Sequence, residues 1–280
     1  MQHPTITCKN CGNHFHGLFC NECGEKVYSL KDKSVKNIFE EIFHFLTHFN
    51  GSFFTTVKIF LLQPGKFSSE YSSGIRKKYF KPVSFFLLLV ITYLLFPRFT
   101  GLNMKFRAYV SEDFDFSWYA VPVAKQKINT YKITGKELAA IYDEKSPHFA
   151  KICLLFLIPL SALVLSAIFF SSKRYFFDHF ILATEIISFY IFLIFLFMPL
   201  LAVLTEKINP AYNYLFEDTS WLRYVVFLVL AIFVTTAFRN FYKQAIWLSS
   251  IKALVFLFVF NSAIRYVYSA ILYLLVMLFV

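Results

Sequence analysis

Five long apolar runs constrain what this chain can fold into more than any other feature of its sequence. They lie at about 79–99, 149–171, 178–204, 221–238 and 250–279. Runs of roughly 18 or more apolar residues are long enough to cross a bilayer core of ~30 Å as helices. Only 16% of the residues are charged, whereas soluble domains carry about 25%. The sequence therefore predicts an all-α membrane protein with about five transmembrane helices.

The predicted spans divide the chain into three regions. Residues 1–26 form a small cysteine-containing segment, residues 27–82 a membrane-proximal region, and residues 83–280 a transmembrane domain. The transmembrane domain includes a long loop at about 100–148, which we expect to form a small extracytoplasmic cap.

The extracytoplasmic loop contains a helix start signal. Thr134 and Glu137 have the spacing of a capping box, in which each side chain bonds the other residue's backbone N–H. The pattern predicts a short helix that ends at about Lys145.

The distribution of Lys and Arg between the short loops predicts how the protein lies in the membrane. Basic residues gather before the first span and in the loops after the second and fourth spans: Arg76, Lys77, Lys78, Lys81, Lys173, Arg174, Arg239, Lys243 and Lys252. The loop after the third span instead carries Glu206, Glu217 and Asp218. Because Lys- and Arg-rich short loops stay in the cytoplasm, we expect a cytoplasmic N-terminus and an extracytoplasmic C-terminus in an inner (cytoplasmic) membrane.

The segment 34–62 has apolar residues at three- and four-residue steps, with polar residues on the other face. This pattern predicts an amphipathic helix. Such a helix beside a membrane domain lies either in the membrane interface or against the transmembrane bundle, and the sequence leaves both open. Gln63-Pro64-Gly65 should end it, because proline removes a backbone donor and glycine permits a turn.

Four cysteines near the N-terminus form two matching knuckles, Cys8-x-x-Cys11 and Cys20-x-x-Cys23. Four thiolates at this spacing wrap one tetrahedral zinc ion, and a shell closed by four cysteines is structural rather than catalytic. The sequence therefore predicts a zinc ribbon with Zn²⁺ as its structural cofactor, in preference to a redox dithiol pair. His14 and His16 lie between the knuckles and are expected to be surface residues.

The net charge of +11 raises the question of nucleic-acid binding, which the distribution of the charge does not favour. The ribbon carries few basic residues, and a strong basic cluster precedes the first span. Basic residues at a membrane edge meet anionic headgroups, at about 1 kcal/mol per charge near the surface. We therefore expect headgroup or interface contacts from these residues: Arg76, Lys77, Lys78, Lys81, Arg174, Asp178, His179 and Arg239.

Two ionisable residues lie inside predicted spans. Glu185 is in the third and Arg265 in the fifth. Because charges in a bilayer are costly, such residues are usually paired or line a path for solutes. We expect an intramembrane pair between Glu185 and Arg265, which is either purely structural or part of a polar path.

The chain also resembles a bacterial family, the domain of unknown function 3667 group, in four places. These are the ribbon from Cys8 to Lys26, the segment Pro64-Gly65-Lys66 with Glu70-Tyr71, Gly74, Arg76, Tyr79 and Pro82, the pair Arg174-Tyr175 with Asp178-His179, and Phe238-Arg239-Asn240-Phe241-Tyr242 with Trp247. The resemblance implies a ribbon, an amphipathic segment and membrane spans in a bacterial inner membrane. It implies no activity.

Three functions remain open from the sequence. We favour a non-enzymatic accessory or scaffold protein of the inner membrane, which docks a membrane or cytoplasmic protein through its ribbon. A second hypothesis is a transporter or channel for a small solute or lipid that uses Glu185 and Arg265. A third is a membrane-embedded lipid-modifying enzyme with candidate groups Arg174, Asp178, His179 and Arg239, for which interface anchoring is the alternative interpretation.

Overall fold

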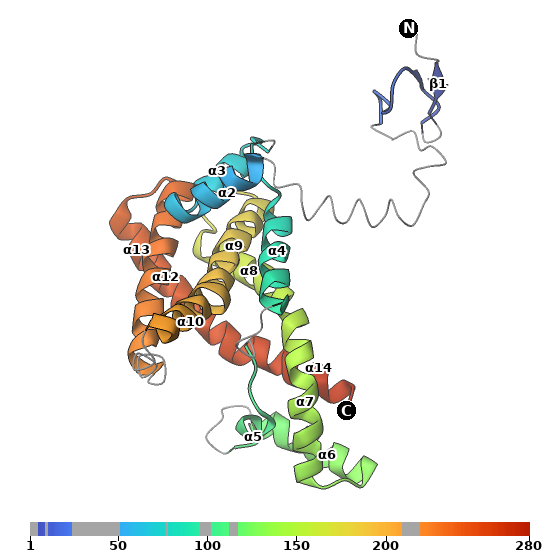
Figure 1. The fold of residues 1–280 in the computed structure, drawn as a ribbon, viewed down its shortest axis with the longest axis vertical. Coiled ribbons are helices and arrows are strands. Elements are labelled where there is room, and N and C mark those ends of the chain that lie inside the picture. The colour runs from blue at the N-terminus through green and yellow to red at the C-terminus, as the bar shows by residue number, and fades with distance from the viewer. Residues whose placement is uncertain are drawn as a thin grey trace. The chain divides into compact units, whose positions relative to one another are not determined.

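The computed structural model describes residues 5–8, 11–23, 51–76, 78–95, 102–111, 117–208 and 219–280. The chain divides into two compact units, Met1–Asn50 and Gly51–Val280. The described part of the first unit is a small ribbon, and the second is a helical bundle (Figure 1).

The ribbon is built on two very short antiparallel strands, β1 (Ile6–Thr7) and β2 (His14–Phe15). Ile6 pairs with Phe15 and Thr7 with His14. The turn between the strands needs Gly12, whose φ of +76° lies in the left-handed region that glycine adopts readily. Among the described residues of the ribbon, the core consists of Phe15 with the buried cysteines Cys8 and Cys20, so apolar packing contributes little to the ribbon's stability.

Four continuous helical stretches in the described residues are long and apolar enough to cross a membrane. The first, Gly135–Ile168, is formed by α7 (Gly135–Cys153), η2 (Leu154–Phe156) and α8 (Leu157–Ile168), and the second, Phe176–Lys207, by α9 (Phe176–Ile191), η3 (Phe192–Phe197) and most of α10 (Met198–Ile208). The third, Trp221–Tyr242, is most of α12 (Thr219–Tyr242). The fourth, Ile246–Leu278, is formed by α13 (Ile246–Ala263), η5 (Ile264–Tyr268) and α14 (Ser269–Leu278). Large apolar side chains such as Phe258 and Leu163 are exposed on them, 75% and 59% respectively. The protein is therefore a membrane protein, as the sequence predicts.

The first predicted span, 79–99, is not among the four. The structure has α4 (Pro82–Leu95) there, with 14 residues, and residues 96–101 are outside the described part. Fourteen residues of α-helix extend ~21 Å, which is less than the ~30 Å of a bilayer core. The described residues thus support four spanning helices, and the predicted count of five is not confirmed. The turn before Pro82 takes up the first residues of the apolar run.

The amphipathic segment is described only from residue 51, so its part at 34–50 lies outside the described residues. α2 (Gly51–Leu62) is followed by the predicted Gln63-Pro64-Gly65 turn and by α3 (Lys66–Ser72). The α2 residue Phe60 is 1% exposed, and its ring meets the rings of Phe85, Phe189 and Phe233 at centroid distances of 5.0, 5.9 and 5.9 Å. This part of the segment therefore packs on the bundle, while Leu62, on its other side, is exposed.

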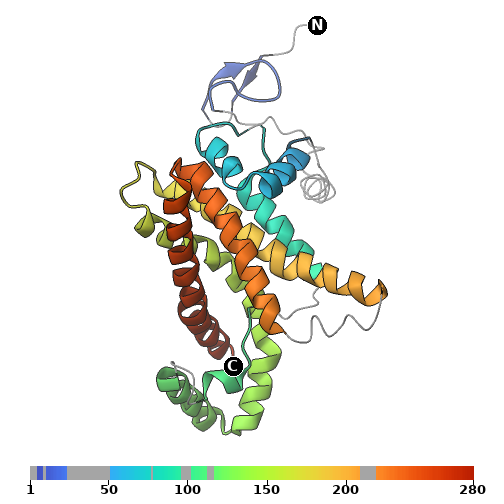
Figure 2. The ribbon, with the colours of Figure 1, turned by 90° about the vertical axis from the view of Figure 1, so that its left-hand side faces the viewer.

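The predicted extracytoplasmic loop is largely helical. It contains α5 (Phe106–Tyr109), α6 (Ser117–Tyr131) and the first turns of α7, at the end of the bundle away from α2 and α3 (Figure 2). The Thr134–Glu137 capping box is confirmed, with Thr134 N donating to Glu137 Oε2 at 2.7 Å. The helix it starts does not end near Lys145 but continues to Cys153.

The longer α7 follows from a buried stripe that crosses the predicted end. Leu138, Tyr142, Ser146 and Ala150 recur every four residues and are all buried. α7 packs against α14, and Lys145 Nζ donates to the backbone oxygen of Phe279 at 2.7 Å. Packing along this stripe stabilises the helix beyond Lys145, although several residues there are polar.

Candidate functional site

The four cysteine thiols of the ribbon form a single cluster. All four sulfur atoms lie within 4.8 Å of one another. Cys8 Sγ is 3.5 Å from Cys23 Sγ, and Cys11 Sγ is 3.6 Å from Cys20 Sγ. Sulfurs ~2.3 Å from a central ion at tetrahedral angles are ~3.8 Å apart, so this donor set fits one tetrahedral metal ion. The cluster can therefore hold a metal ion with a shell made only of protein thiolates.

Two thiols of the cluster have pKa values that are shifted in opposite directions: that of Cys20 is lowered towards the thiolate form that binds metals, and that of Cys11 is raised to about 12. Backbone N–H groups of Cys23 and Glu22, as hydrogen-bond donors, lower the pKa of the Cys20 thiol to about 6. His14 is not among the clustered donors, since its Nδ1 is 3.0 Å from Thr7 Oγ1. His16 is exposed and is also outside the cluster, as expected for both histidines.

Glu185 of α9 is the most deeply buried acidic side chain among the described residues, at 1% exposure. Its Oε1 accepts a hydrogen bond from Gly65 N at 2.7 Å, and its Oε2 accepts one from Ser68 N at 3.1 Å. The Ser68 hydroxyl also donates to Oε2. The carboxylate therefore caps the N-terminal end of α3, where backbone N–H groups otherwise have no partner and a negative charge is favoured.

The Pro64-Gly65 turn brings α3 against two bundle helices. Gly65 has φ +80°, and a Cβ there would lie 2.3 Å from the backbone oxygen of Ala237 in α12. Asn240 Nδ2 of the same helix donates to Pro64 O at 2.8 Å. Glycine is required because only a residue without a Cβ fits both the conformation and the approach. The turn, α9 and α12 thus form one closely packed junction.

The predicted pair between Glu185 and Arg265 is not formed, which corrects the sequence interpretation. Both oxygens of Glu185 bond α3, whereas Arg265 lies in η5, is exposed, and has its guanidinium 5.8 Å from the centre of the Tyr266 ring. The physical reason is that a helix N-terminus supplies the donors that a buried carboxylate needs. The expectation considered only ionisable partners and therefore missed backbone donors.

The basic residues before α4 contact different groups and do not form one cluster. Lys78 Nζ donates to Glu70 Oε2 at 2.6 Å, and the Tyr79 hydroxyl donates to the same oxygen at 2.8 Å. The Arg76 guanidinium lies 5.6 Å from the centre of the Tyr71 ring and 5.7 Å from that of Phe177. Lys81 is exposed, and Lys77 lies outside the described residues.

A second group gathers where α9 begins. Arg174 Nη2 donates to Phe241 O at 3.2 Å, and His179 Nδ1 is 2.7 Å from the Tyr242 hydroxyl. Asp178 accepts from Tyr175 N at 3.2 Å and so caps α9. The structure therefore brings Arg174, Asp178 and His179 together, and Arg239 is exposed.

Sequence reasoning missed four residues of these two sites. Gly65 and Ser68 bond Glu185, and Tyr242 and Lys252 join the group at the start of α9. The sequence signal for the first pair is the Pro64-Gly65 turn, which marks a helix end and also a close approach of the backbone. Nothing local to Lys252 indicates its contact, which depends on how α13 packs.

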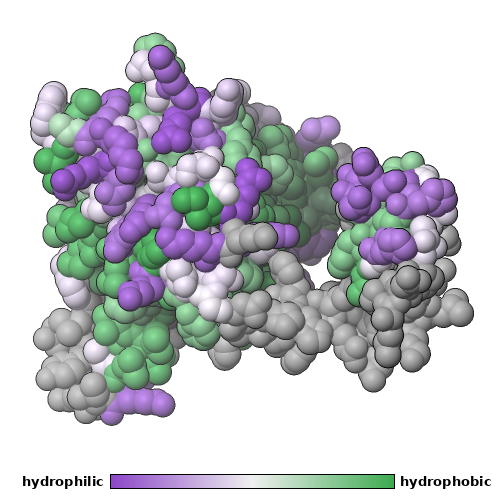
Figure 3. Space-filling view, turned by 90° about the horizontal axis from the view of Figure 1, so that it is seen from above, coloured by the Kyte–Doolittle hydropathy of each residue, from purple (hydrophilic) through white to green (hydrophobic). Residues whose placement is uncertain are grey.

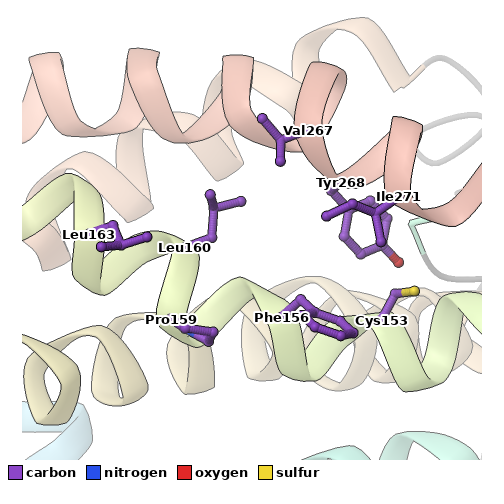
Figure 4. Close-up of a pocket in the computed structure, with 8 residues that line it drawn as sticks. All are labelled: Cys153, Phe156, Pro159, Leu160, Leu163, Val267, Tyr268 and Ile271. Atoms are coloured by element: carbon purple, nitrogen blue, oxygen red, sulfur yellow. The ribbon is translucent and has the colours of Figure 1, made fainter.

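One further feature of the helical unit is a pocket of ≈ 170 Å³ (Figure 4). Its lining is Cys153, Phe156, Pro159, Leu160, Leu163, Val267, Tyr268 and Ile271. The Tyr268 hydroxyl donates to Ala150 O at 3.0 Å. The lining of the pocket is therefore almost entirely apolar. Cys153, a buried free cysteine, is not one of the four clustered thiols of the ribbon.

Comparison with known families adds one finding. Residues 50–94 match the family described as "Protein of unknown function (DUF3667)". The chain resembles that family. The matched segment covers α2, the Pro64-Gly65 turn, α3 and nearly all of α4, so it includes the start of α3 that Glu185 caps. No curated protein and no solved structure shows significant similarity to the chain.

Proposed function

We propose that this protein is a non-enzymatic membrane accessory protein that docks a protein partner through a zinc-stabilised ribbon. The helical unit anchors the protein in the membrane. Zinc is the proposed ion, because four thiolates in a closed tetrahedral shell are typical of structural zinc. We place the ribbon in the cytoplasm of a bacterium, where reducing conditions keep the thiols free.

The observation that carries this proposal is the composition of the metal shell. Cys8, Cys11, Cys20 and Cys23 supply all four donors, so a tetrahedral ion has no open position for substrate or water. The segment between the knuckles presents Leu18 and Phe19, which are 67% and 60% exposed. We assign these two adjacent side chains to the contact surface for the partner.

The two alternative functions have less support. A transport path through Glu185 and Arg265 would need a carboxylate that faces a pathway, and Glu185 is instead bonded to α3. The candidate acid–base groups of a lipid-modifying enzyme have structural contacts, since Asp178 caps α9 and His179 Nδ1 lies 2.7 Å from the Tyr242 hydroxyl. Anchoring roles account for these contacts without any reaction.

The test is a comparison of variants of the full-length protein, purified in mild detergent. Bound metal is measured by elemental analysis and co-purifying proteins by quantitative mass spectrometry. We expect Cys11→Ser to lose both the zinc and the partner. The double variant Leu18→Ala/Phe19→Ala should keep the zinc and lose the partner, because these side chains are outside the metal cluster.

The matched control is Cys153→Ala, which removes a thiol of the helical unit and should change neither reading. Partner recovery that is unchanged in both ribbon variants contradicts the proposal. Ribbon-dependent binding to protein-free vesicles, with no ribbon-dependent protein, would assign the ribbon to the membrane surface and also contradict it.

A further inference from the structure

The contacts of α2 indicate how deep its last turn lies in the helical unit. Phe60 packs on Phe189 and on Phe233, with ring centres 5.9 Å apart in both cases. α9 begins at Phe176, so Phe189 lies ~20 Å along that helix. α12 ends at Tyr242, so Phe233 lies ~14 Å before that end. The last turn of α2 is therefore level with the interior of two candidate spans and not with their ends.

α3 returns the chain towards the start of α9. The hydroxyl of Ser68 donates to Ile181 O at 3.3 Å, and the Arg76 guanidinium, beyond α3, lies 5.7 Å from the centre of the Phe177 ring. From Glu185 onwards, successive contacts of α3 thus meet α9 ever closer to its first turn. Figure 1 shows α2 and α3 side by side at one end of the helical unit. The two helices form a hairpin whose second arm leads back out of the bundle.

The turn between α2 and α3 has partners for its backbone groups. Gly65 N and Ser68 N donate to Glu185, and Pro64 O accepts from Asn240. Pro64 and Gly65 are both buried. Lipid offers no hydrogen bonds, so non-helical backbone at membrane depth is tolerated only where the protein buries and bonds it. The contacts of Glu185 and Asn240 are those that a turn inside a membrane requires.

The face of α2 that points away from the bundle is apolar at its last turn. Leu61 and Leu62 are 42% and 69% exposed, whereas Phe60 is buried. On α12, Ile232 follows the same pattern, since it is 60% exposed beside the buried Phe233. Exposed apolar side chains of a spanning helix meet lipid, and the two leucines lie at the same depth. They therefore continue the lipid-facing surface of α12.

The exposed polar side chains near these leucines have partners on the hairpin or a route to the surface. Lys66 Nζ donates to Gln63 Oε1 at 2.7 Å and lies 4.0 Å from Glu70 Oε1. Lys58 shares the outer face of α2 one turn earlier, and its long stem can place the ammonium among headgroups. Seen from the end where the hairpin lies, hydrophilic residues gather on the helical unit and hydrophobic residues border them (Figure 3).

We propose that α2, the Pro64-Gly65 turn and α3 form a re-entrant hairpin, in which Leu61 and Leu62 contact lipid acyl chains. α2 descends along α4, α9 and α12, the turn is bonded by Glu185 and Asn240, and α3 returns to the side from which α2 comes. Lipid is the occupant of the outer face, because that face continues the exposed surface of a candidate span. The hairpin is independent of the ribbon and of its proposed partner.

The test is photo-crosslinking of the full-length protein in vesicles of phosphatidylglycerol and phosphatidylcholine. p-Benzoylphenylalanine, which bonds to neighbouring C–H groups on irradiation, replaces Leu62 in one variant and Ile232 in another. Mass spectrometry identifies the products. We expect acyl-chain adducts at Leu62 at the level found at Ile232, because the two side chains lie at the same depth.

Phe53 is the matched control, since it belongs to the same helix but faces the protein. Its ring centre lies 5.7 Å from that of Phe80 and 6.2 Å from that of Phe85. The same replacement there should give crosslinks within the chain in place of lipid adducts, and circular dichroism confirms that each variant stays folded. Adducts of Leu62 confined to lipid headgroups would place α2 on the membrane surface and overturn the re-entrant hairpin. Crosslinks of Leu62 to another protein chain would assign the outer face to a protein interface and overturn the lipid contact.

Discussion

The ribbon and α3 are both too short to be stable alone, and they are held in different ways. The ribbon has four thiols that lie within 4.8 Å of one another and come from one short segment. α3 has 7 residues, and its first turn is bonded by Glu185, more than 110 residues further along the chain. The ribbon therefore has its metal-binding groups within its own short segment, whereas α3 depends on a side chain of α9.

The largest expected effect is that of metal removal, which should unfold the ribbon and leave the helical unit folded. Treatment with a strong chelator should unfold the ribbon, because zinc binding supplies the folding energy of such small modules. The helical unit should keep its structure, since no described residue beyond Asn50 belongs to the cysteine cluster. Far-ultraviolet circular dichroism and elemental analysis of the chelated protein check this. A large loss of helical signal on chelation would contradict it.

The second effect concerns Glu185. Glu185→Ala should destabilise the helical unit by about 3 kcal/mol or more, because each buried donor left without a partner costs about 1–3 kcal/mol. The donors are Gly65 N, Ser68 N and the Ser68 hydroxyl. Thermal unfolding in detergent measures the change.

Arg265→Gln is the control for Glu185→Ala. Arg265 is exposed and is not bonded to Glu185. We expect it to change stability by less than about 1 kcal/mol. Equal destabilisation by the two variants would support the Glu185–Arg265 pair and contradict the contact between Glu185 and α3.

The contrast between the units explains what could be predicted from the sequence. The cysteine cluster depends on two knuckles with a fixed local spacing, so the donor set was predictable. Glu185 was predictable as an unusual residue, because a carboxylate inside an apolar run is costly. Its partner was not, because backbone donors leave no mark in the sequence and their approach depends on the packing of α9 against α3.

Helix ends show the same division. The Thr134 cap of α7 was predicted, because its two side chains are close in sequence. The end at Cys153 was missed, because packing of α7 on α14 extends the helix. The first span, predicted at 79–99, stays a prediction, because the described part of α4 reaches Leu95 and residues 96–101 lie outside the described residues.

The third effect tests the close approach at the turn. Gly65→Ala should destabilise the helical unit strongly, since its Cβ would meet Ala237 O at 2.3 Å. Gly74→Ala is a matched control, because Gly74 also has a positive φ, of +102°, but nothing lies within 4 Å of an added Cβ. We expect Gly74→Ala to cost about 1–3 kcal/mol from backbone strain alone, and Gly65→Ala clearly more. Thermal unfolding of both variants measures the difference, and equal losses would contradict the packed junction.

The smallest effect is a pH dependence at Glu70. The hydrogen bond from Lys78 holds the pKa of the Glu70 carboxyl below its ordinary value of 4.5. A carboxyl with a lowered pKa stabilises the fold above its unfolded pKa, and this contribution is lost as the pH falls through the folded pKa. Glu70→Gln should therefore reduce stability by less than about 1 kcal/mol at neutral pH, and the difference from the natural protein should vanish under acidic conditions. Unfolding curves at neutral and acidic pH measure it; a difference that persists in acid would contradict the ion pair.

Hydrogen exchange, read in the ribbon and in α3 from the same sample, tests the independence of the two units most directly. Peptides that cover residues 11–23 and 63–73 are compared in the natural protein, after chelation and in Glu185→Ala. The account predicts that chelation accelerates exchange only in the ribbon, and that Glu185→Ala accelerates exchange only in the α3 peptide. Acceleration of both peptides by either change would contradict it.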